Sequence, residues 1–306
     1  MRYSALFPFL VMSAALLVDR LAGEPRVCHP LIGFGRLAMM IERRLRRGSC
    51  KRALGILAVA ALIVPLAILV WFLSAHLGPA FDIAVLYLAI APRSLEEHAF
   101  AVAHALRRAD LDGARNAVGK IVSRDTGSMS TSDVARAAVE STLENGNDAA
   151  FGALFWFLVL GAPGAVAFRL ANTLDAMWGY RNETYREFGW AAARLDDVLN
   201  LLPARLTALT YCIVGDTSAA LRCWKAQAAA WYSPNAGPVM AAGAGALRVQ
   251  LGGAASYGGQ LKERPALGCG APPDALDIAR AVALVRRGIV VWTTVVAVLC
   301  LASALA

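Results

Sequence analysis

The stretch ALGILAVAALIVPLAILVWFLSA, residues 53–75, contains no charged side chain. A helix of about 20 apolar residues is long enough to cross the hydrocarbon core of a bilayer, so this stretch predicts a membrane-spanning helix. IVVWTTVVAVLCLASALA, residues 289–306, predicts a second one by the same criterion. The chain is therefore expected to be an integral membrane protein.

Two further apolar runs extend this assignment. SALFPFLVMSAALLV, residues 4–18, is followed by Asp19 and Arg20 without an A-x-A cleavage site, which favours a retained membrane helix over a secretory signal peptide. AFDIAVLYLAIA, residues 80–91, is short and is expected to return the chain after a hairpin at residues 76–79.

The composition agrees with a membrane protein. Of 306 residues, 58% are hydrophobic and 17% charged, and the mean hydropathy is +0.53, which is too apolar for a soluble domain of this size. The net charge of +8 comes from Lys and Arg beside apolar runs, with no separate basic domain, so we expect no nucleic-acid partner. Six cysteines without a C-x-x-C pair indicate neither a zinc site nor a disulfide framework.

Basic residues predict the orientation. Seven Lys and Arg between residues 36 and 52 lie in the connection between the first two apolar runs, which places that loop in the cytoplasm by the positive-inside rule. The polar segment that follows residue 92 is expected to form a cytoplasmic helical insert, residues 93–148, within a single membrane domain, residues 1–306. Its helices are predicted to begin at the capping box of residues 94–97, at Asp112, and at Ser130 with Asp133.

Two apolar segments are interrupted. Residues 149–168 contain Gly161-Ala162-Pro163-Gly164, and residues 199–214 contain Pro203 and Arg205. Non-helical backbone is tolerated at membrane depth only where protein or a cavity covers it. We expect re-entrant hairpins here, because they keep the polar motifs NTLDAMWGYR (residues 172–181) and SRDT (residues 123–126) on one face. The predicted fold class is all-α: a polytopic helical membrane protein with a cytoplasmic insert and re-entrant hairpins.

Carboxylates gather beside these segments. Glu140 and Glu144 are four residues apart and share a helix face, so they are either two solvated acids or a pair facing a cation. That cation is expected to be Mg²⁺ or an arginine such as Arg124 or Arg136. 

Two more acidic groups follow along the chain. Asp175 lies near Asn172, and Asp196-Asp197 lies near Arg194. Mg²⁺ prefers one or two carboxylates together with waters and phosphate oxygens, so several such groups at one membrane face suit a metal–nucleotide site. Ionisable groups at membrane depth are usually functional.

Phosphate binding requires donors. Guanidinium groups bind phosphate bidentately, and SPNAG (residues 233–237) and LGGAASYGG (residues 251–259) are glycine-rich enough to bring backbone N–H groups near an anion. Gly113 to Gly119 does not have the spacing of a P-loop, and no G-x-S-x-G supports a serine nucleophile. The arginine candidates are Arg124, Arg169, Arg181, Arg194 and Arg205.

The motifs DRLAGEPRVCHPLIGFGRL, IVSRDT, VARAAVESTLEN, NTLDAMWGYRNETYREFGWAAARLDDVLNLLPARL, SPNAG and LGGAASYGG, in this order, resemble the adenosylcobinamide-phosphate synthase family of cobalamin biosynthesis. The resemblance covers most of the chain. It implies a carbon–nitrogen ligase in the cell inner membrane, multi-pass, with its active site facing the cytoplasm. Such an enzyme uses ATP and Mg²⁺ to join adenosylcobyric acid to aminopropanol or its phosphate.

On this resemblance we assign roles to the acidic, basic and amide residues in one cytoplasmic pocket. The expected partners are the corrinoid and amine substrates and membrane lipid, with a homo-oligomer or other membrane enzymes of the pathway as further partners. The predicted catalytic residues are Asp175, Asp197 and Glu144; the metal ligands are Asp175, Asp196 and Glu140; the substrate- and phosphate-binding residues are Arg124, Asp125, Asn172, Arg181, Arg194, Arg205 and Asn235.

The chain departs from the family pattern at one acidic position. Family members typically read SPNAGWPEAAMAGAL where this chain reads SPNAGPVMAAGAGAL, so Met240 replaces an acid and the Trp-Pro pair is absent. A diverged, non-catalytic membrane relative that binds or senses a ligand is therefore the alternative, since fold similarity alone does not fix function. A transporter is disfavoured, because the charges gather at one face instead of lining a midplane path between repeats.

Overall fold

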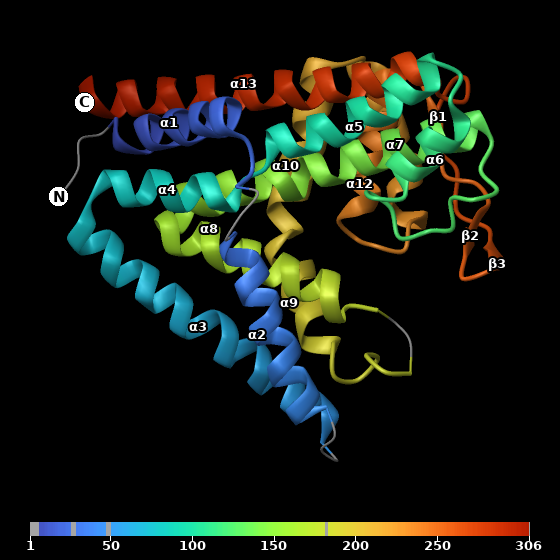
Figure 1. Ribbon diagram of the computed structural model, residues 1–306. Coiled ribbons are helices and arrows are strands. Elements are labelled where there is room, and N and C mark those ends of the chain that lie inside the picture. Colours follow the sequence, from blue (N-terminus) through green and yellow to red (C-terminus); the bar gives the residue numbers. More distant parts are fainter. Residues whose placement is uncertain (1–5, 26–28, 47–49, 181–182, 306) are drawn as a thin grey trace. The chain divides into compact units, whose positions relative to one another are not determined.

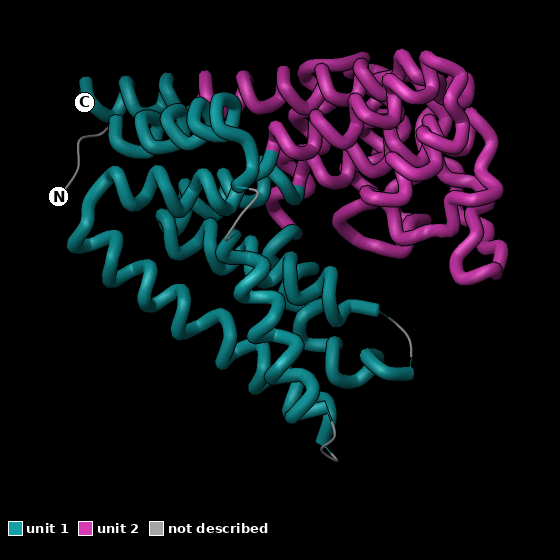
Figure 2. The backbone as a smooth tube through the Cα atoms, viewed as in Figure 1, with its two compact units in different colours: residues 1–91, 148–200, 296–306 teal, residues 92–147, 201–295 magenta. Residues whose placement is uncertain are grey.

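The computed structural model describes residues 6–25, 29–46, 50–180 and 183–305 (Figure 1). It is 76% helical, and the predicted all-α class is confirmed. The chain forms two compact units, each assembled from segments that are distant in the sequence (Figure 2). Unit 1 comprises residues 1–91, 148–200 and 296–306, and unit 2 comprises residues 92–147 and 201–295. The single domain with an insert at residues 93–148 stays a prediction.

Unit 1 is built around the first predicted span. Its core packs Leu62 of that span against Leu174, Trp178 and Phe188. Gly55 permits a close approach of two backbones, because a Cβ there would lie 2.0 Å from the carbonyl oxygen of Phe188. The helices of unit 1 are α1 (Phe7–Ala22), α2 (Pro30–Leu45), α3 (Lys51–Leu77), α4 (Pro79–Ala89), α8 (Gly152–Trp178) and α9 (Trp190–Leu199), with a π-helical turn (Asn147–Phe151) before α8.

Helix α8 folds back on itself at Gly161. This residue has φ 70° and ψ −158°, a conformation open to glycine. A Cβ on Gly152 would lie 2.1 Å from the ring of Phe168, whereas sixteen residues of straight helix would separate the two by about 24 Å. The arm from Gly152 to Gly161 is about 13 Å long, far short of the roughly 30 Å of a bilayer core. The reversal predicted at residues 161–164 is confirmed, and its re-entry by one membrane face stays a prediction.

A second hairpin joins α3 to α4 at Gly78, which has φ 76°. The hydroxyl of Ser74 donates a 2.6 Å hydrogen bond to the buried carboxylate of Asp82, which connects the two helices across the turn. The expectation that residues 80–91 return the chain is confirmed.

Among the residues that the structure describes, three helical segments are long and apolar enough to cross a membrane: α3, the run Thr131–Trp178, and α13 (Ala275–Leu305). The first and last contain the two spans predicted from sequence, although α13 begins earlier. The run Thr131–Trp178 contains the reversal at Gly161 and is not one straight span. Helices α9 and α10 (Leu201–Val214) are long and apolar enough for a span only when they are taken together, and the helix is broken between them at Asn200. Helix α1 has 16 residues and is shorter than a span, so its role in the membrane stays a prediction.

Unit 2 is built around α12, whose residues are all buried. Short antiparallel strand pairs, not foreseen in the sequence, follow it: β1 (Gln250–Leu251) with β4 (Leu267–Gly268), and β2 (Ala255–Tyr257) with β3 (Gln260–Lys262). The helices are α5 (Pro92–Arg107), α6 (Leu111–Val118), α7 (Thr131–Gly146), α10, α11 (Thr217–Gln227), α12 (Ala236–Leu247) and the start of α13, with a 3₁₀ turn at Ala228–Ala230.

The predicted helix starts are correct in one case of three. Ser130 and Asp133 form the expected reciprocal capping box of α7. Helix α5 begins at Pro92, before the predicted capping box, because proline is suited to the first helical turn. Helix α6 is capped by Asp110, which accepts a 2.8 Å hydrogen bond from the Gly113 N–H, and not by Asp112. The basic connection expected as a loop is also helical, because residues 30–45 form α2.

Candidate functional site

The motif NTLDAMWGYR ends helix α8. Asn172 and Asp175 lie one turn apart on its last two turns, and both are half-buried. A Cβ on Gly179 would lie 2.0 Å from a carboxylate oxygen of Asp175, so the acid packs directly against a residue without a side chain. No described residue donates a hydrogen bond to the Asp175 carboxylate or forms an ion pair with it. Arg181, the last residue of the motif, lies outside the described residues.

Helix α9 supplies the second acidic pair of unit 1. One oxygen of Asp196 accepts hydrogen bonds from the side-chain amides of Asn172 at 3.4 Å and Asn200 at 3.1 Å. Asn200 lies one turn after Asp196, so α9 positions both groups. Asp197 forms an ion pair with Arg194 at 3.2 Å. The structure thus brings together Asn172 of α8 and the two aspartates of α9, as the sequence analysis expected.

Asp148 completes this group, which we call the acidic cluster: Asp148, Asp175, Asp196 and Asp197. Asp148 comes from the π-helical turn, and it interacts electrostatically with both Asp175 and Asp196. Like charges brought together away from bulk water repel one another. A cation drawn from solution would relieve this repulsion.

Arg169 is a second cation of unit 1 that acts on the acidic cluster, besides Arg194. It lies on α8, and its charge acts on Glu24 and Asp148. Its Nε atom is buried and has no hydrogen-bond partner in the described part of the chain. Sequence reasoning named Arg169 only as one of five arginines, because nothing local distinguishes it.

The acidic cluster fits a metal–nucleotide better than a bare ion. Among the described residues, no three His, Cys, Asp or Glu side chains are placed to hold a metal ion by themselves. Mg²⁺ needs only one or two carboxylates when phosphate oxygens and waters fill its other positions. Asp175 and Asp196 could supply those carboxylates, and their assignment as metal ligands stays a prediction.

Glu140 lies in a different environment, in unit 2. It is 2% exposed, and its carboxylate accepts hydrogen bonds from Arg124 at 2.5 Å, from both terminal nitrogens of Arg264 at 2.8 and 3.2 Å, and from the Gly252 N–H at 2.8 Å. We call these four residues the Glu140 site. Four donors match the acceptor capacity of a carboxylate. Of the two cations considered for the Glu140–Glu144 pair, the structure shows arginine at Glu140, while Glu144 is exposed.

The SRDT loop also holds the glycine-rich segment. Asp125 accepts hydrogen bonds from the Gly259 N–H at 2.8 Å and the Ser256 hydroxyl at 2.7 Å. The Gly259 N–H and then the Ser256 hydroxyl hold the pKa of the Asp125 carboxyl below its ordinary value, because both bonds favour the charged form. Asp125 therefore anchors the β2–β3 hairpin in this structure.

Arg205 and Asn235, both predicted to bind substrate, contact each other. Arg205 donates to the Asn235 side-chain oxygen at 2.6 Å and to the Pro234 carbonyl at 3.0 Å, which joins α10 to the SPNAG loop. Met240 lies on α12 with 1% exposure, so the departure from the family pattern is inside the core of unit 2. An acid at that position would need a buried partner.

The predicted site residues fall in both units. Whether they share one pocket stays a prediction. Sequence reasoning assigned no role to Asp148, Asn200, Arg264 and Gly252. Asn200 contacts its neighbour Asp196, whereas the other three are recognised only through contacts with distant segments. The predicted site residues of unit 1 are Asn172, Asp175, Arg194, Asp196 and Asp197. The predicted site residues of unit 2 are Arg124, Asp125, Glu140, Glu144, Arg205 and Asn235.

Comparison with known proteins supports the family resemblance. A family model described as CobD/Cbib protein matches residues 12–285. The cobalamin biosynthesis protein CobD of Chromobacterium violaceum is 57% identical over 292 residues, which cover 92% of this chain and 94% of the relative. Proteins of the same name from Stutzerimonas stutzeri (55% identical, 94% and 96% covered) and Rhodobacter capsulatus (38%, 94% and 95%) are also similar. No solved structure matches the chain.

Proposed function

Because this chain belongs to the CobD/Cbib family of cobalamin biosynthesis proteins, we propose that it is an ATP-dependent ligase of the cell inner membrane. It joins a propionate carboxylate of adenosylcobyric acid to the amine of aminopropanol or its phosphate, with the active site facing the cytoplasm. The acidic cluster of unit 1 is the observation that carries this proposal.

The chemistry requires two steps. A carboxylate is a poor acceptor for an amine, so a carboxylate oxygen first attacks the γ-phosphorus of ATP, which gives an acyl phosphate and ADP. The amine then attacks the acyl carbon, phosphate leaves, and a base takes the proton that the nitrogen loses. Phosphoryl transfer depends on positioning and on neutralising charge at the phosphates, which is the chemistry that Mg²⁺ supplies when it is bound.

The residues of unit 1 suit these requirements. Asp175 and Asp196 would hold the nucleotide-bound Mg²⁺, because neither is ion-paired within the described residues and the repulsion within the acidic cluster favours a cation. The amides of Asn172 and Asn200 fix the orientation of Asp196. We assign Asp197 as the base, with its position set by its ion pair with Arg194.

The arginines predicted to bind phosphate fall into two groups. Arg194 is exposed beside Asp197 and can turn toward an anion. Arg124 and Arg205 already donate to protein acceptors, so we assign them to holding the SRDT and SPNAG loops. Glu144, exposed on α7, is kept as a second candidate base.

The test is direct synthesis. Purified protein in detergent is incubated with MgATP, adenosylcobyric acid and aminopropanol phosphate, or aminopropanol, and the products are analysed by mass spectrometry. We expect the amide and one ADP per amide formed. Tight substrate binding without any amide or ADP would favour the non-catalytic relative, and the ligase proposal would be rejected.

A further inference from the structure

Helix α2 carries its positive charge on one face. Its other face packs into unit 1 through Phe34 and Ala38, with Leu31, Ile41 and Leu45 beside them. The exposed face repeats at positions i, i+3, i+4, i+7 and i+8, so its side chains form one stripe along the helix. This stripe, which we call the Arg–Met face, consists of Arg36, Met39, Met40, Arg43 and Arg44.

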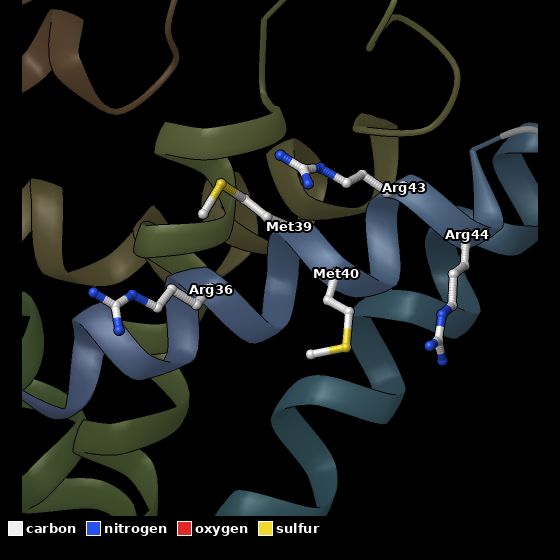
Figure 3. Close-up of a pocket in the computed structure, with 5 residues that line it drawn as sticks. All are labelled: Arg36, Met39, Met40, Arg43 and Arg44. Atoms are coloured by element: carbon white, nitrogen blue, oxygen red, sulfur yellow. The ribbon is translucent and has the colours of Figure 1, made fainter.

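These five side chains line a shallow cavity of about 280 Å³ (Figure 3). In Figure 3, Met39 and Arg43 extend from one side of the helix, and Met40 and Arg44 extend from the other. Met39 is 41% exposed and Met40 is 49% exposed. Two flexible thioethers therefore lie open between three guanidinium groups, an arrangement that combines apolar contact with charge.

The arginines of this face have no acidic partner among the described residues. The one acid of α2, Glu42, is buried and is paired with Arg46 at 3.0 Å. Arg46 also lies over the ring of Tyr185, so this arginine is used within unit 1. As far as the described residues go, the cations of the Arg–Met face are available to a ligand from outside the chain.

Most of the net positive charge of the protein lies in the segment that contains α2. Residues 30–52 contain seven Lys or Arg and one Glu, which leaves six of the eight excess positive charges in this segment. Helix α3, the most apolar of the candidate spans, begins at Lys51 within it. A cluster of Lys and Arg beside a membrane-spanning helix attracts anionic lipid headgroups.

We propose that the Arg–Met face of α2 binds an anionic phospholipid. The guanidinium groups of Arg36, Arg43 and Arg44 hold the phosphodiester, and Met39 and Met40 contact the first carbons of the acyl chains. The exposed methionines favour a lipid over a free phosphate ion, because an ion offers nothing for them to contact. Each basic residue near an anionic surface contributes about 1 kcal/mol, so three of them give a preference on the order of a hundredfold at low salt.

The test compares lipids bound to the full-length protein. Protein in detergent receives equal amounts of phosphatidylglycerol and phosphatidylcholine, and bound lipids are counted by native mass spectrometry. We expect the wild type to retain phosphatidylglycerol at least about tenfold more than phosphatidylcholine, with the preference falling as salt screens the charges. Equal retention of the two lipids by the wild type would overturn the proposal.

Three variants locate the site. R36Q/R43Q/R44Q should lose the preference, whereas R36K/R43K/R44K, which keeps the charge, should retain most of it. The charge-matched control R107Q/R108Q/K225Q alters exposed residues of unit 2 and should bind like the wild type. An equal loss in this control would show a general charge effect and would contradict a site on α2.

A fourth variant separates a lipid from a free anion. M39Q/M40Q keeps every charge and should weaken phosphatidylglycerol binding several-fold. If it binds this lipid normally, or if millimolar inorganic phosphate displaces the lipid from the wild type, the face is an anion site and the lipid proposal is wrong. If R36Q/R43Q/R44Q does not insert into the membrane, M39Q/M40Q and R36K/R43K/R44K still test the lipid proposal.

Discussion

The carboxylates of the Glu140 site and of the acidic cluster lie in opposite environments. Glu140 is buried and receives four hydrogen bonds, from two arginines and a backbone N–H. In the acidic cluster, Asp175 has no donor among the described residues and lies near other acids. A carboxylate whose acceptor capacity is filled by the protein stabilises the fold, whereas acids that outnumber the neighbouring arginines can bind a cation from solution. The comparison separates a structural acid from candidate functional ones.

The largest effect is expected at Glu140. Glu140→Gln leaves Arg124 and Arg264 without their counter-charge in a buried site, and breaking such a pair from one side costs about 3–5 kcal/mol. We expect the free energy of unfolding, measured by denaturant titration in detergent, to fall by that amount. The matched control is Glu144→Gln, one turn along α7 and exposed, whose effect on stability should stay within about 0.5 kcal/mol. Equal losses of stability in the two variants would show that Glu140 has no special structural role.

Asp175→Asn should lower the activity without lowering the stability. Its removal takes one negative charge from the acidic cluster, so the thermal midpoint is expected to stay or rise. The rate of amide formation should fall on the order of a hundredfold or more, because stabilisation of the transferred phosphoryl group is lost. Initial rates under saturating MgATP and the melting curve of the same sample give both quantities. A variant that keeps its turnover would exclude Asp175 from the active site.

Gly179→Ala tests the position of Asp175 without changing any charge. The new Cβ would meet a carboxylate oxygen at 2.0 Å and the Asp175 carbonyl oxygen at 2.7 Å, so the acid must shift. We expect a loss of activity of about tenfold, since small displacements of a catalytic group are costly. The control is Gly33→Ala on α2, where nothing lies within 4 Å of the added Cβ. If both variants keep wild-type rates, the packing of Asp175 against Gly179 has no catalytic importance.

The smallest effect concerns Asp125 and depends on pH. Hydrogen bonds in the folded state lower its pKa below the ordinary 3.8, so its stabilising contribution is present above that value and is lost as the pH falls through the folded pKa. The difference in thermal midpoint between wild type and Asp125→Asn should therefore shrink as the pH falls from about 5 to below 3. A difference that is constant over this range would mean that the charge of Asp125 does not hold the hairpin.

The fold was predictable where the information is local. The apolar run at residues 53–75, the interruption at Gly161 and the capping pair of Ser130 and Asp133 each depend on neighbouring residues, and all three are confirmed. The start of α6 was misplaced by two residues because Asp110 and Asp112 are both suitable caps, and only the fold selects between them. The strands after α12 were missed, since glycine-rich sequence has little periodicity to detect.

The site was predictable in part for the same reason. Motif spacing identified Asn172, Asp175 and Asp196, which one helix end and its neighbour bring together. It could not identify Arg264, which contacts Glu140 across more than a hundred residues and lies in a segment without any recognisable motif. Long-range ion pairs are fixed by the packing of distant helices, and a single sequence carries no local record of them.

We propose that the acidic cluster, and not the Glu140 site, holds the nucleotide-bound cation. Mn²⁺ can replace Mg²⁺ as a paramagnetic probe, so its binding to the purified protein with a non-hydrolysable ATP analogue can be titrated by electron paramagnetic resonance. We predict that the wild type and the Asp125→Asn control bind the metal–nucleotide stoichiometrically and that D175N/D196N does not. Unchanged binding in D175N/D196N, with the fold intact, would contradict the account.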